Sequence, residues 1–271
     1  MYGKGVDGRS SLERSFVSFV DVTDPGRLPE YHDWQLYDHV PENRALRGVA
    51  CGDRWTRIPG AVSVERLDER FTGVDSLTMH WFLPPYEESV WNKLGVDSVQ
   101  WGRGPGIPGV VRPFIGHFDT VKGYAAPRSL VTPRVLPHRP NHGLHVTLTN
   151  VDDPLGPEAH LRYQRENRGA LPGLLAVYGV VGAWTFSLRE SPVSLWNPSG
   201  DDTYEPHDLR LRILYLDDVP GHGGRTHRRD GGGAEVDGKA EVLIAAPLAS
   251  CAPAVACPSP APGFRSAGAH P

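Results

Sequence analysis

The hydrophobic spacing of the first part of the chain alternates between that of a β-strand and that of an α-helix. Ser15–Val22 (SFVSFVDV) carries apolar residues at both alternating sets of positions, which is typical of a strand buried on both faces. A turn sequence, Thr23-Asp24-Pro25-Gly26, follows it. Leu28–Leu46 then has helical spacing, and Gly48–Arg57 looks extended. The alternation predicts an α+β fold in which helices pack against a sheet.

The same alternation continues to about residue 125. Ser76–Leu83 places its side chains on two alternating faces and reads as a strand. Pro84–Leu94 is an expected helix, which Gly95 is expected to end. Phe114–Val121 reads as another strand. The resulting order, β-α-β-β-α-β, is that of a ferredoxin-like unit.

The second half of the chain repeats this order weakly. Expected strands lie at His145–Val151, Asp208–Leu216 and Lys239–Pro247. The motif Ala45-Leu46-Arg47-Gly48 has a counterpart in Ala170-Leu171-Pro172-Gly173. We expect a duplicated unit, and the alternative is that such short matches arise by chance.

The expected organisation is a first unit at 13–125, a linker at 126–141, a diverged or truncated second unit at 142–247 and a tail at 248–271. The tail is rich in Ala and Pro, a composition that buries too little apolar surface to offset chain entropy. We therefore expect the tail to be disordered, whether it is a native end or a frame-altered one.

Charge and cysteine content exclude several classes of function. A net charge of −4 carries no signature of nucleic-acid binding. The cysteines Cys51, Cys251 and Cys257 form no CxxC pair, so neither a disulfide framework nor a cysteine zinc site is expected. No run approaches the ~18 apolar residues of a membrane span, and the polar N-terminus does not read as a signal peptide. We expect a cytoplasmic protein that binds neither nucleic acid nor membrane.

The helix Tyr31–Leu46 is the best candidate for a site. It carries a dense set of titratable and aromatic side chains, namely Tyr31, His32, Asp33, Trp34, Tyr37, Asp38, His39 and Glu42. A helix that only covers a sheet does not need so many such groups. Pro41 removes a backbone donor and clashes with the carbonyl of Tyr37, so we expect a kink near Val40.

This helix and the strand after it resemble the dimeric α/β-barrel superfamily, and within it the EthD-like branch and its uncharacterised actinobacterial relatives. The positions that carry the resemblance are Trp34, Tyr37, Asp38, His39, Pro41 and Gly48-Val49. The resemblance covers about residues 15–125 and, faintly, 142–218. It implies two ferredoxin-like sheets paired into a barrel, within one chain or in a homodimer, with a small aromatic or apolar ligand between sheet and helix. Activities in the superfamily are mixed, so the fold implies no single reaction.

His39 is the predicted proton-transfer residue, because an imidazole titrates near neutral pH. Glu42 is expected to assist it better than Asp38, because adjacent helical residues point about 100° apart. His80 lies under the helix near His39 if its face of the strand looks into the barrel. The structural alternative for His39 is a surface histidine or one that caps a broken helical turn.

The predicted substrate-binding residues are Asp38, Arg54, Trp34, Tyr37 and Trp55. Arg54 can hold a carboxylate or phenolate through two hydrogen bonds. A surface ion pair of Arg54 with Asp53 or Glu65 is the alternative. Trp55 is expected either in the core or against a ligand.

No metal is expected, because His32, His39 and His80 lack a dense ligand spacing. The superfamily resemblance leaves haem bound through one histidine as an alternative to a site without cofactor. His117, with Asp119 on the same face of its strand, is a second candidate site, for which a core histidine is the alternative.

These residues together predict a cofactor-independent enzyme, a cyclase, isomerase, dehydratase or monooxygenase, of secondary metabolism or aromatic degradation. It would act on an aromatic or apolar metabolite by proton transfer at His39. A non-catalytic ligand-binding or assembly protein of the same fold is the alternative. In the alignment of the two Ala-Leu motifs, Asp38 and His39 correspond to Tyr163 and Gln164, so only the first unit is expected to act.

Overall fold

The computed structural model describes residues 12–57, 68–101, 109–190, 204–218 and 240–250. The strands are β1 (Arg14–Val22), β2 (Val49–Arg57), β3 (Ser76–Phe82), β4 (Val110–Ala125), β5 (Gly143–Val151), β6 (Val180–Glu190), β7 (Leu209–Leu216) and β8 (Ala240–Ser250). The α-helices are α1 (Leu28–Asp33), α2 (Val40–Arg44), α3 (Glu88–Gln100), α4 (Pro157–Arg165) and α5 (Leu171–Ala176). Two π-helical segments, η2 (Trp34–His39) and η7 (Glu166–Ala170), join α1 to α2 and α4 to α5. Short 3-10 segments are η1 (Pro25–Arg27), η3 (Glu69–Phe71), η5 (Pro127–Ser129) and η6 (Pro133–His138).

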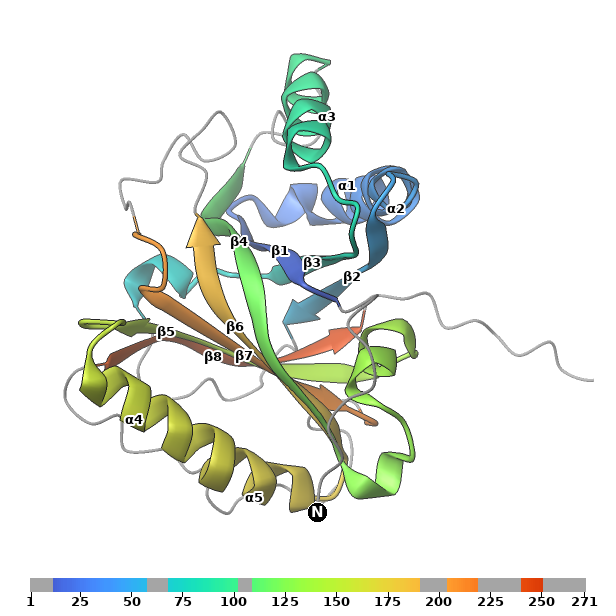
Figure 1. Ribbon diagram of the computed structural model, residues 1–271. Coiled ribbons are helices and arrows are strands. Elements are labelled where there is room, and N and C mark those ends of the chain that lie inside the picture. The colour runs from blue at the N-terminus through green and yellow to red at the C-terminus, as the bar shows by residue number, and fades with distance from the viewer. Residues whose placement is uncertain (1–11, 58–67, 102–108, 191–203, 219–239, 251–271) are drawn as a thin grey trace, which may run out of the picture.

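The described strands form one closed antiparallel barrel, in the order β1-β3-β2-β8-β5-β7-β6-β4 (Figure 1). Two junctions join the halves of the chain: β4 pairs with β6, and β2 pairs with β8. The first half contributes the adjacent strands β4-β1-β3-β2, and the second contributes β8-β5-β7-β6. The expected barrel is confirmed, and a single chain closes it, so the barrel leaves no open sheet edge.

The inside of the barrel holds the main hydrophobic core. On β3, Leu77, Met79 and Trp81 belong to this core, as the alternation of the strand predicts. Every residue of β3 is buried, including Thr78 and His80 on the other face. Those two side chains point away from the barrel interior, toward the covering helices. The condition that this face looks into the barrel is not met, yet His80 lies beneath the first helix and lines one pocket with His39.

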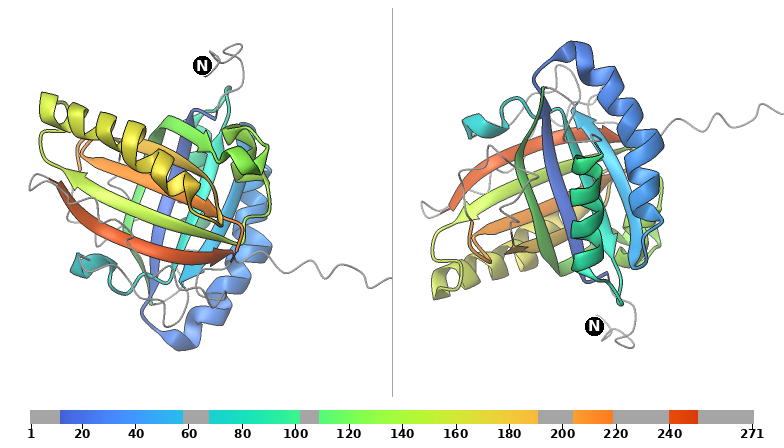
Figure 2. Two further views of the ribbon diagram at one scale, coloured as in Figure 1. Left: turned by 90° about the horizontal axis from the view of Figure 1, so that it is seen from below. Right: turned by 90° about the horizontal axis from the view of Figure 1, so that it is seen from above.

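Helices cover the outer faces of the strands. In Figure 2, α1 and α2 form one continuous helix on the outside of the strands of the first half, and α3 lies on the same side. Helices α4 and α5 lie on the outside of the strands of the second half. Trp91 of α3 is 6% exposed and packs on Phe16 and Phe82. None of the described helices is long and apolar enough to cross a membrane.

Proline explains the irregular turn in each of the two long helices. The N–H of Val40 bonds to the carbonyl of Gln35, five residues back, in the turn just before Pro41. The N–H of Leu171 makes the same bond to the carbonyl of Glu166 before Pro172. Widening the turn accommodates a proline that has no N–H to donate. The irregularity expected near Val40 is thus a π-helical turn within a continuous helix.

The matching prolines correct the alignment of the two halves. Gly48 and Gly179, which precede β2 and β6, also match, with φ angles of 88° and 90°. By contrast, Ala45 lies after α2 whereas Ala170 ends η7. The pairing of the two Ala-Leu motifs was therefore wrong, and His39 corresponds to Ala170 rather than to Gln164.

Two predicted boundaries are also corrected. Gly95 lies inside α3, which continues to Gln100, so it does not end that helix. Leu248–Ser250 were expected to begin a disordered tail, yet they are the end of β8. Leu248 pairs with Arg57 of β2 and Leu144 of β5 and is 1% exposed. The rest of the predicted tail, 251–271, lies outside the described residues.

Replacing Leu248 tests whether the end of β8 belongs to the core. Leu248→Ala should lower the free energy of unfolding by about 2–5 kcal/mol, because it leaves a cavity in the barrel. The control is Leu155→Ala at a residue that is 78% exposed, where a change within about 0.5 kcal/mol is expected. Urea unfolding measures both variants. Equal stability of the two would show that β8 does not close the core.

Candidate functional site

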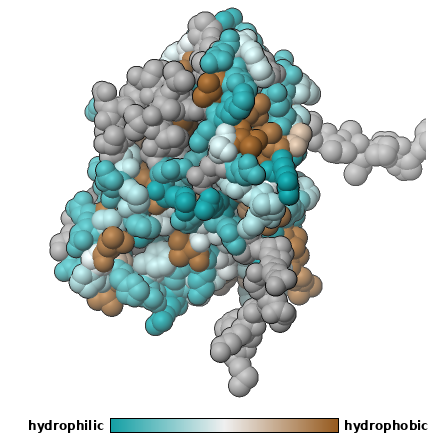
Figure 3. Space-filling model, turned by 45° about the horizontal axis from the view of Figure 1, so that its top comes forward, coloured by the Kyte–Doolittle hydropathy of each residue, from teal (hydrophilic) through white to brown (hydrophobic). Residues whose placement is uncertain are grey.

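A pocket lies between the first helix and the outer face of the first-half strands. It is small, with a cavity volume of about 30 Å³, and part of it is open to solvent. Strands β1, β3 and β4 and segment η2 supply its lining, which consists of Phe16, Ser18, Gln35, His39, Thr78, His80, Arg112 and Ile115. On the face of the molecule in Figure 3, hydrophobic residues form separate small groups among hydrophilic ones. The pocket is therefore the stronger candidate for a ligand site.

His80 lies at the bottom of this pocket and is 1% exposed. Its ring packs 4.9 Å from the ring of Trp91, centroid to centroid. Gly52, its partner across the β2–β3 ladder, makes the room, because a Cβ at Gly52 would overlap the imidazole. Burial holds the pKa of His80 well below its usual value of 6.5, and the charges of His39 and Arg44 lower it further. His80 is therefore neutral near pH 7.

His39 enters the pocket from η2. Its ring stacks on Trp34, with centroids 4.5 Å apart and planes at 26°. The side-chain Nδ2 of Asn43 lies 3.1 Å from its Nε2. An amide nitrogen only donates, so when the ring is neutral Nε2 accepts from Asn43 and the proton lies on Nδ1. The structure thus brings His39 and His80, two of the three predicted catalytic residues, to one pocket.

Several buried polar atoms in the pocket lining have no hydrogen-bond partner among the described residues. They are the hydroxyls of Ser18 and Thr78, the Oε1 of Gln35 and both ring nitrogens of His80. Most buried polar atoms in folded proteins are hydrogen-bonded, so such a cluster at a pocket is the arrangement expected where a ligand or water completes the bonding. The lining contains no Asp or Glu.

Arg112 is a pocket residue that the sequence analysis missed. Phe19 and Asp21 of β1 pair with Phe114 and Val111 of β4, so β4 holds one extra residue between these pairs. This β-bulge allows Arg112 and Ile115, three residues apart, to line the same pocket. In a regular strand, residues three apart lie on opposite faces. A basic residue inside an apolar strand was the available signal, but its direction depends on the bulge.

Arg54 lies outside the pocket lining, under α1. Its Nη1 is 2.6 Å from Nδ1 of His32, and its Nη2 donates to Ser76 Oγ at 3.0 Å. Its guanidinium also lies 5.2 Å from the ring centre of Tyr31. Burial lowers the pKa of His32, and the charge of Arg54 lowers it further, which suits a neutral ring that accepts from the guanidinium. Arg54 is 1% exposed, so the alternative of a surface ion pair is wrong.

The other predicted residues are dispersed. Tyr37 is 71% exposed and Asp38 is exposed, and neither lines the pocket. Glu42 is half-buried one turn beyond His39, and Trp55 lies in the barrel core on the opposite face of the sheet. Among the described residues, no group of three or more His, Cys, Asp or Glu side chains is arranged to hold a metal ion.

The second predicted site, His117 with Asp119, is divided between the interior and the surface. His117 is fully buried, with its ring 5.1 Å from that of Phe16. Asp119 lies nearer the surface and makes loose ion pairs with Arg14 at 3.8 Å and Arg189 at 3.6 Å. Burial raises the pKa of Cys51 to about 12, so its thiol stays protonated.

The second half of the chain also carries buried polar groups beneath its helix, contrary to the expectation that only the first half would. Several of them pair with each other. Arg212 donates to Glu166 of η7 at 2.8 Å, and Tyr163 lies 3.0 Å from the hydroxyl of Thr185. Arg210 donates to Ser187. Others, the Nε of Arg212 and the Nδ1 of His145 among them, have no hydrogen-bond partner among the described residues, so both halves carry unsatisfied buried polar atoms.

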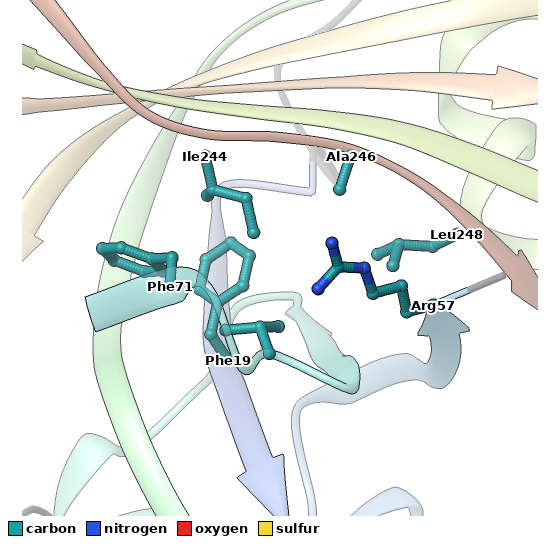
Figure 4. Close-up of a pocket in the computed structure, with 7 residues that line it drawn as sticks. Phe19, Arg57, Phe71, Ile244, Ala246 and Leu248 are labelled. Carbon is teal, nitrogen blue, oxygen red and sulfur yellow. The ribbon is translucent and has the colours of Figure 1, made fainter. Parts of the chain in front are cut away.

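A second, smaller cavity, of about 10 Å³, lies where β1, β2 and β8 meet η3 (Figure 4). Phe19, Phe71 and Ile244 are among the apolar side chains that line it. The Arg57 guanidinium points into this cavity, and its Nη1 donates to the carbonyl of Thr72 at 2.7 Å. The lining has one charged group and no histidine, so it offers no proton-transfer pair.

No protein-family model matches the chain, and no curated protein matches its sequence. Solved structures share its fold at low identity. An anthrone oxidase-like protein matches with a TM-score of 0.52 at 9% identity, over 91% of this chain and 97% of that one. The dye-decolorizing protein from V. cholerae matches with a TM-score of 0.50 at 12% identity, over 90% and 95%. These similarities show a shared fold, and the dimeric α/β-barrel superfamily and its EthD-like branch stay predictions.

The buried histidines should make the protein less stable in mild acid. Burial lowers the pKa of His145 to about 4, with a further contribution from Arg212, and that of His80 well below 6.5. Above pH 6.5 both rings are neutral whether the chain is folded or unfolded. As the pH falls below 6.5, the unfolded chain binds protons that the folded chain does not, so stability falls.

Between pH 7 and pH 4.5 the free energy of unfolding of each protein should fall. For the unmodified protein the fall should be about 1–3 kcal/mol larger than for His145→Gln. The control is His160→Gln, at an exposed histidine of α4. Urea unfolding at a series of pH values measures the difference. The assigned pKa shift would be wrong if all three proteins lost stability equally.

Proposed function

We propose that this protein is a cofactor-independent enzyme that transfers protons to and from a small molecule bound between the first helix and the barrel. The observation that carries the proposal is the pocket that His39 and His80 share with several unsatisfied polar atoms. The structural neighbours, titled as an anthrone oxidase-like protein and a dye-decolorizing protein, support an enzyme that acts on small molecules. We extend that class of activity to this chain as a proposal only.

In the proposed reaction, His80 removes a proton from a carbon or hydroxyl of the bound molecule and then returns it, to the same atom or to another. His80 suits this role, because its lowered pKa keeps it neutral near pH 7. His39 suits the role of hydrogen-bond donor to the negative charge that forms on the bound molecule, because Asn43 can hold Nε2 and leave the proton on Nδ1. Trp34 positions the His39 ring by stacking on it. Isomerisation, cyclisation, dehydration and oxygenation of an activated carbon can all begin with such a transfer.

We propose that no cofactor takes part. Haem would need a histidine facing a broad flat slot. The cavity at His39 and His80 has a volume of only about 30 Å³, and the groups around it include the hydroxyls of Ser18 and Thr78 and the amide of Gln35. These residues do not fit haem, and we assign it no step.

We further propose that the two halves are tandem ferredoxin-like units of an EthD-like relative. The support is that each half places its fourth strand beside its first, then its third, then its second. The matching π-helical turns before Pro41 and Pro172 add to it. Because one chain supplies both sets of four strands, a homodimer is not needed to close the barrel, and a homodimer stays a prediction.

Anthrone, the compound named for one neighbour, is a suitable probe because its methylene protons are acidic. In D2O without oxygen, the protein should speed exchange of these protons, measured by NMR. His39→Ala should lower the catalysed rate on the order of 10²-fold or more while the fold and the affinity for anthrone are retained. His80→Gln should do the same, and the exposed His160→Gln should not.

Full exchange activity in His39→Ala would contradict the proposed mechanism. Binding of anthrone or of other enolisable aromatic ketones with no exchange and no oxygen uptake would instead favour the alternative, a ligand-binding or assembly protein of the same fold.

A further inference from the structure

We propose that the pocket binds an organic monoanion, a carboxylate or phenolate on an aromatic or short aliphatic body, and that Arg112 is the residue that holds its charge. This pocket is the site of the proposed function, on which any catalytic role of the bound anion rests. Binding of the anion follows from the residues that line the pocket and can be measured without turnover.

Arg112 is a buried charge without a counter-ion among the described residues. It is 8% exposed, and no carboxylate of the described chain lies within ion-pair distance of it. Burying a charge is costly unless the charge is paired, so an unpaired guanidinium in a pocket favours an anion supplied from outside. Bidentate binding of a carboxylate is the strongest arrangement open to it.

Other arginines of the described chain have partners that Arg112 lacks. Arg54, the other buried one, bonds to His32 and Ser76 and lies against Tyr31. Arg212 and Arg139 have carboxylate partners, at 2.8 Å in Glu166 and 2.7 Å in Asp217. The guanidinium of each of these three arginines has at least one hydrogen-bond or ion-pair partner within the protein, whereas Arg112 lines the pocket.

The surroundings of Arg112 define the rest of the ligand. Phe16 and Ile115 supply apolar wall for a ring or short chain. The hydroxyls of Ser18 and Thr78 and the ring nitrogens of His80 can donate to or accept from further oxygens. With no Asp or Glu in the lining, nothing there repels an anion. One guanidinium and a neutral His80 balance a single negative charge, so a monoanion fits better than a phosphate dianion.

The β-bulge in β4 explains why Arg112 lies in the pocket. The extra residue between the pairs Phe19–Phe114 and Asp21–Val111 allows Arg112 to share the pocket with Ile115. Bulges often re-aim a side chain next to an active site. We therefore assign to Arg112 the anion-binding role that the sequence analysis gave to Arg54.

Benzoate and benzamide are matched probes, equal in shape and different in charge. Calorimetric titration of the full chain should give a dissociation constant for benzoate at least about tenfold below that for benzamide. Arg112→Met should raise the benzoate constant about tenfold or more and leave the benzamide constant within about twofold. The matched control is Arg57→Met in the second cavity, which should change neither constant.

A stability readout separates an anion-binding arginine from a structural one. Without ligand, Arg112→Met should raise the melting temperature by about 2–4 °C, because it removes a buried unpaired charge. Arg54→Met should lower the melting temperature, because it leaves the partners of Arg54 unsatisfied. If Arg112→Met does not fold, Arg112→Lys serves instead and should reduce the preference for benzoate over benzamide, since lysine cannot bind a carboxylate in bidentate fashion.

Four results would overturn the proposal: no saturable benzoate binding, equal affinity for benzamide, an unchanged benzoate constant in Arg112→Met, or loss of benzoate binding in Arg57→Met. Benzoate binding that depends on Arg112, in a protein that exchanges no protons of any probe, would sustain this inference and defeat the proposed function. Proton exchange on neutral probes, in a protein that binds benzoate no better than benzamide, would sustain the proposed function and defeat this inference.

Discussion

Closure of the barrel within one chain is the constraint on which the rest of this structure depends. β8 pairs with both β2 and β5 and so joins the strands of the two halves. Aromatic and aliphatic side chains, Trp55, Trp81, Trp184 and Phe186 among them, fill the interior. The interior is packed, and the candidate pocket with its two histidines lies on the outer face of the strands, where helices supply the second wall.

Both halves of the barrel bury polar side chains between their strands and the helix that covers them. Each carries polar side chains beneath a helix interrupted by a π-helical turn. In the second half, Arg212 pairs with Glu166 and Tyr163 with Thr185, although the Nε of Arg212 has no partner among the described residues. In the first half, the hydroxyl of Thr78 and the ring of His80 are left without partners among the described residues. Unsatisfied buried groups are unfavourable for folding, and a protein retains them mainly where function requires them.

Much of the fold could be predicted from the sequence. The strands at Ser15–Val22 and Ser76–Leu83 and the helix from Leu28 were found because period-2 and helical spacing are local properties. The extent of α3 beyond Gly95 was missed, because a glycine in a helix costs only about 1 kcal/mol and neighbouring packing can override it. β8 was predicted too short, because its last residues are held by β2 and β5, which are distant in sequence.

The same division applies to the site. The sequence by itself determined that the first helix carries His39 and that β3 carries His80, because residue identity and strand or helix periodicity decide both. Only the tertiary structure decided that these two meet, that Arg54 is bonded under α1 and that Arg112 reaches the pocket. The physical reason is that a one-residue bulge changes the face on which the following side chains lie, and the bulge is defined by pairing with β1 rather than by the residues of β4 alone.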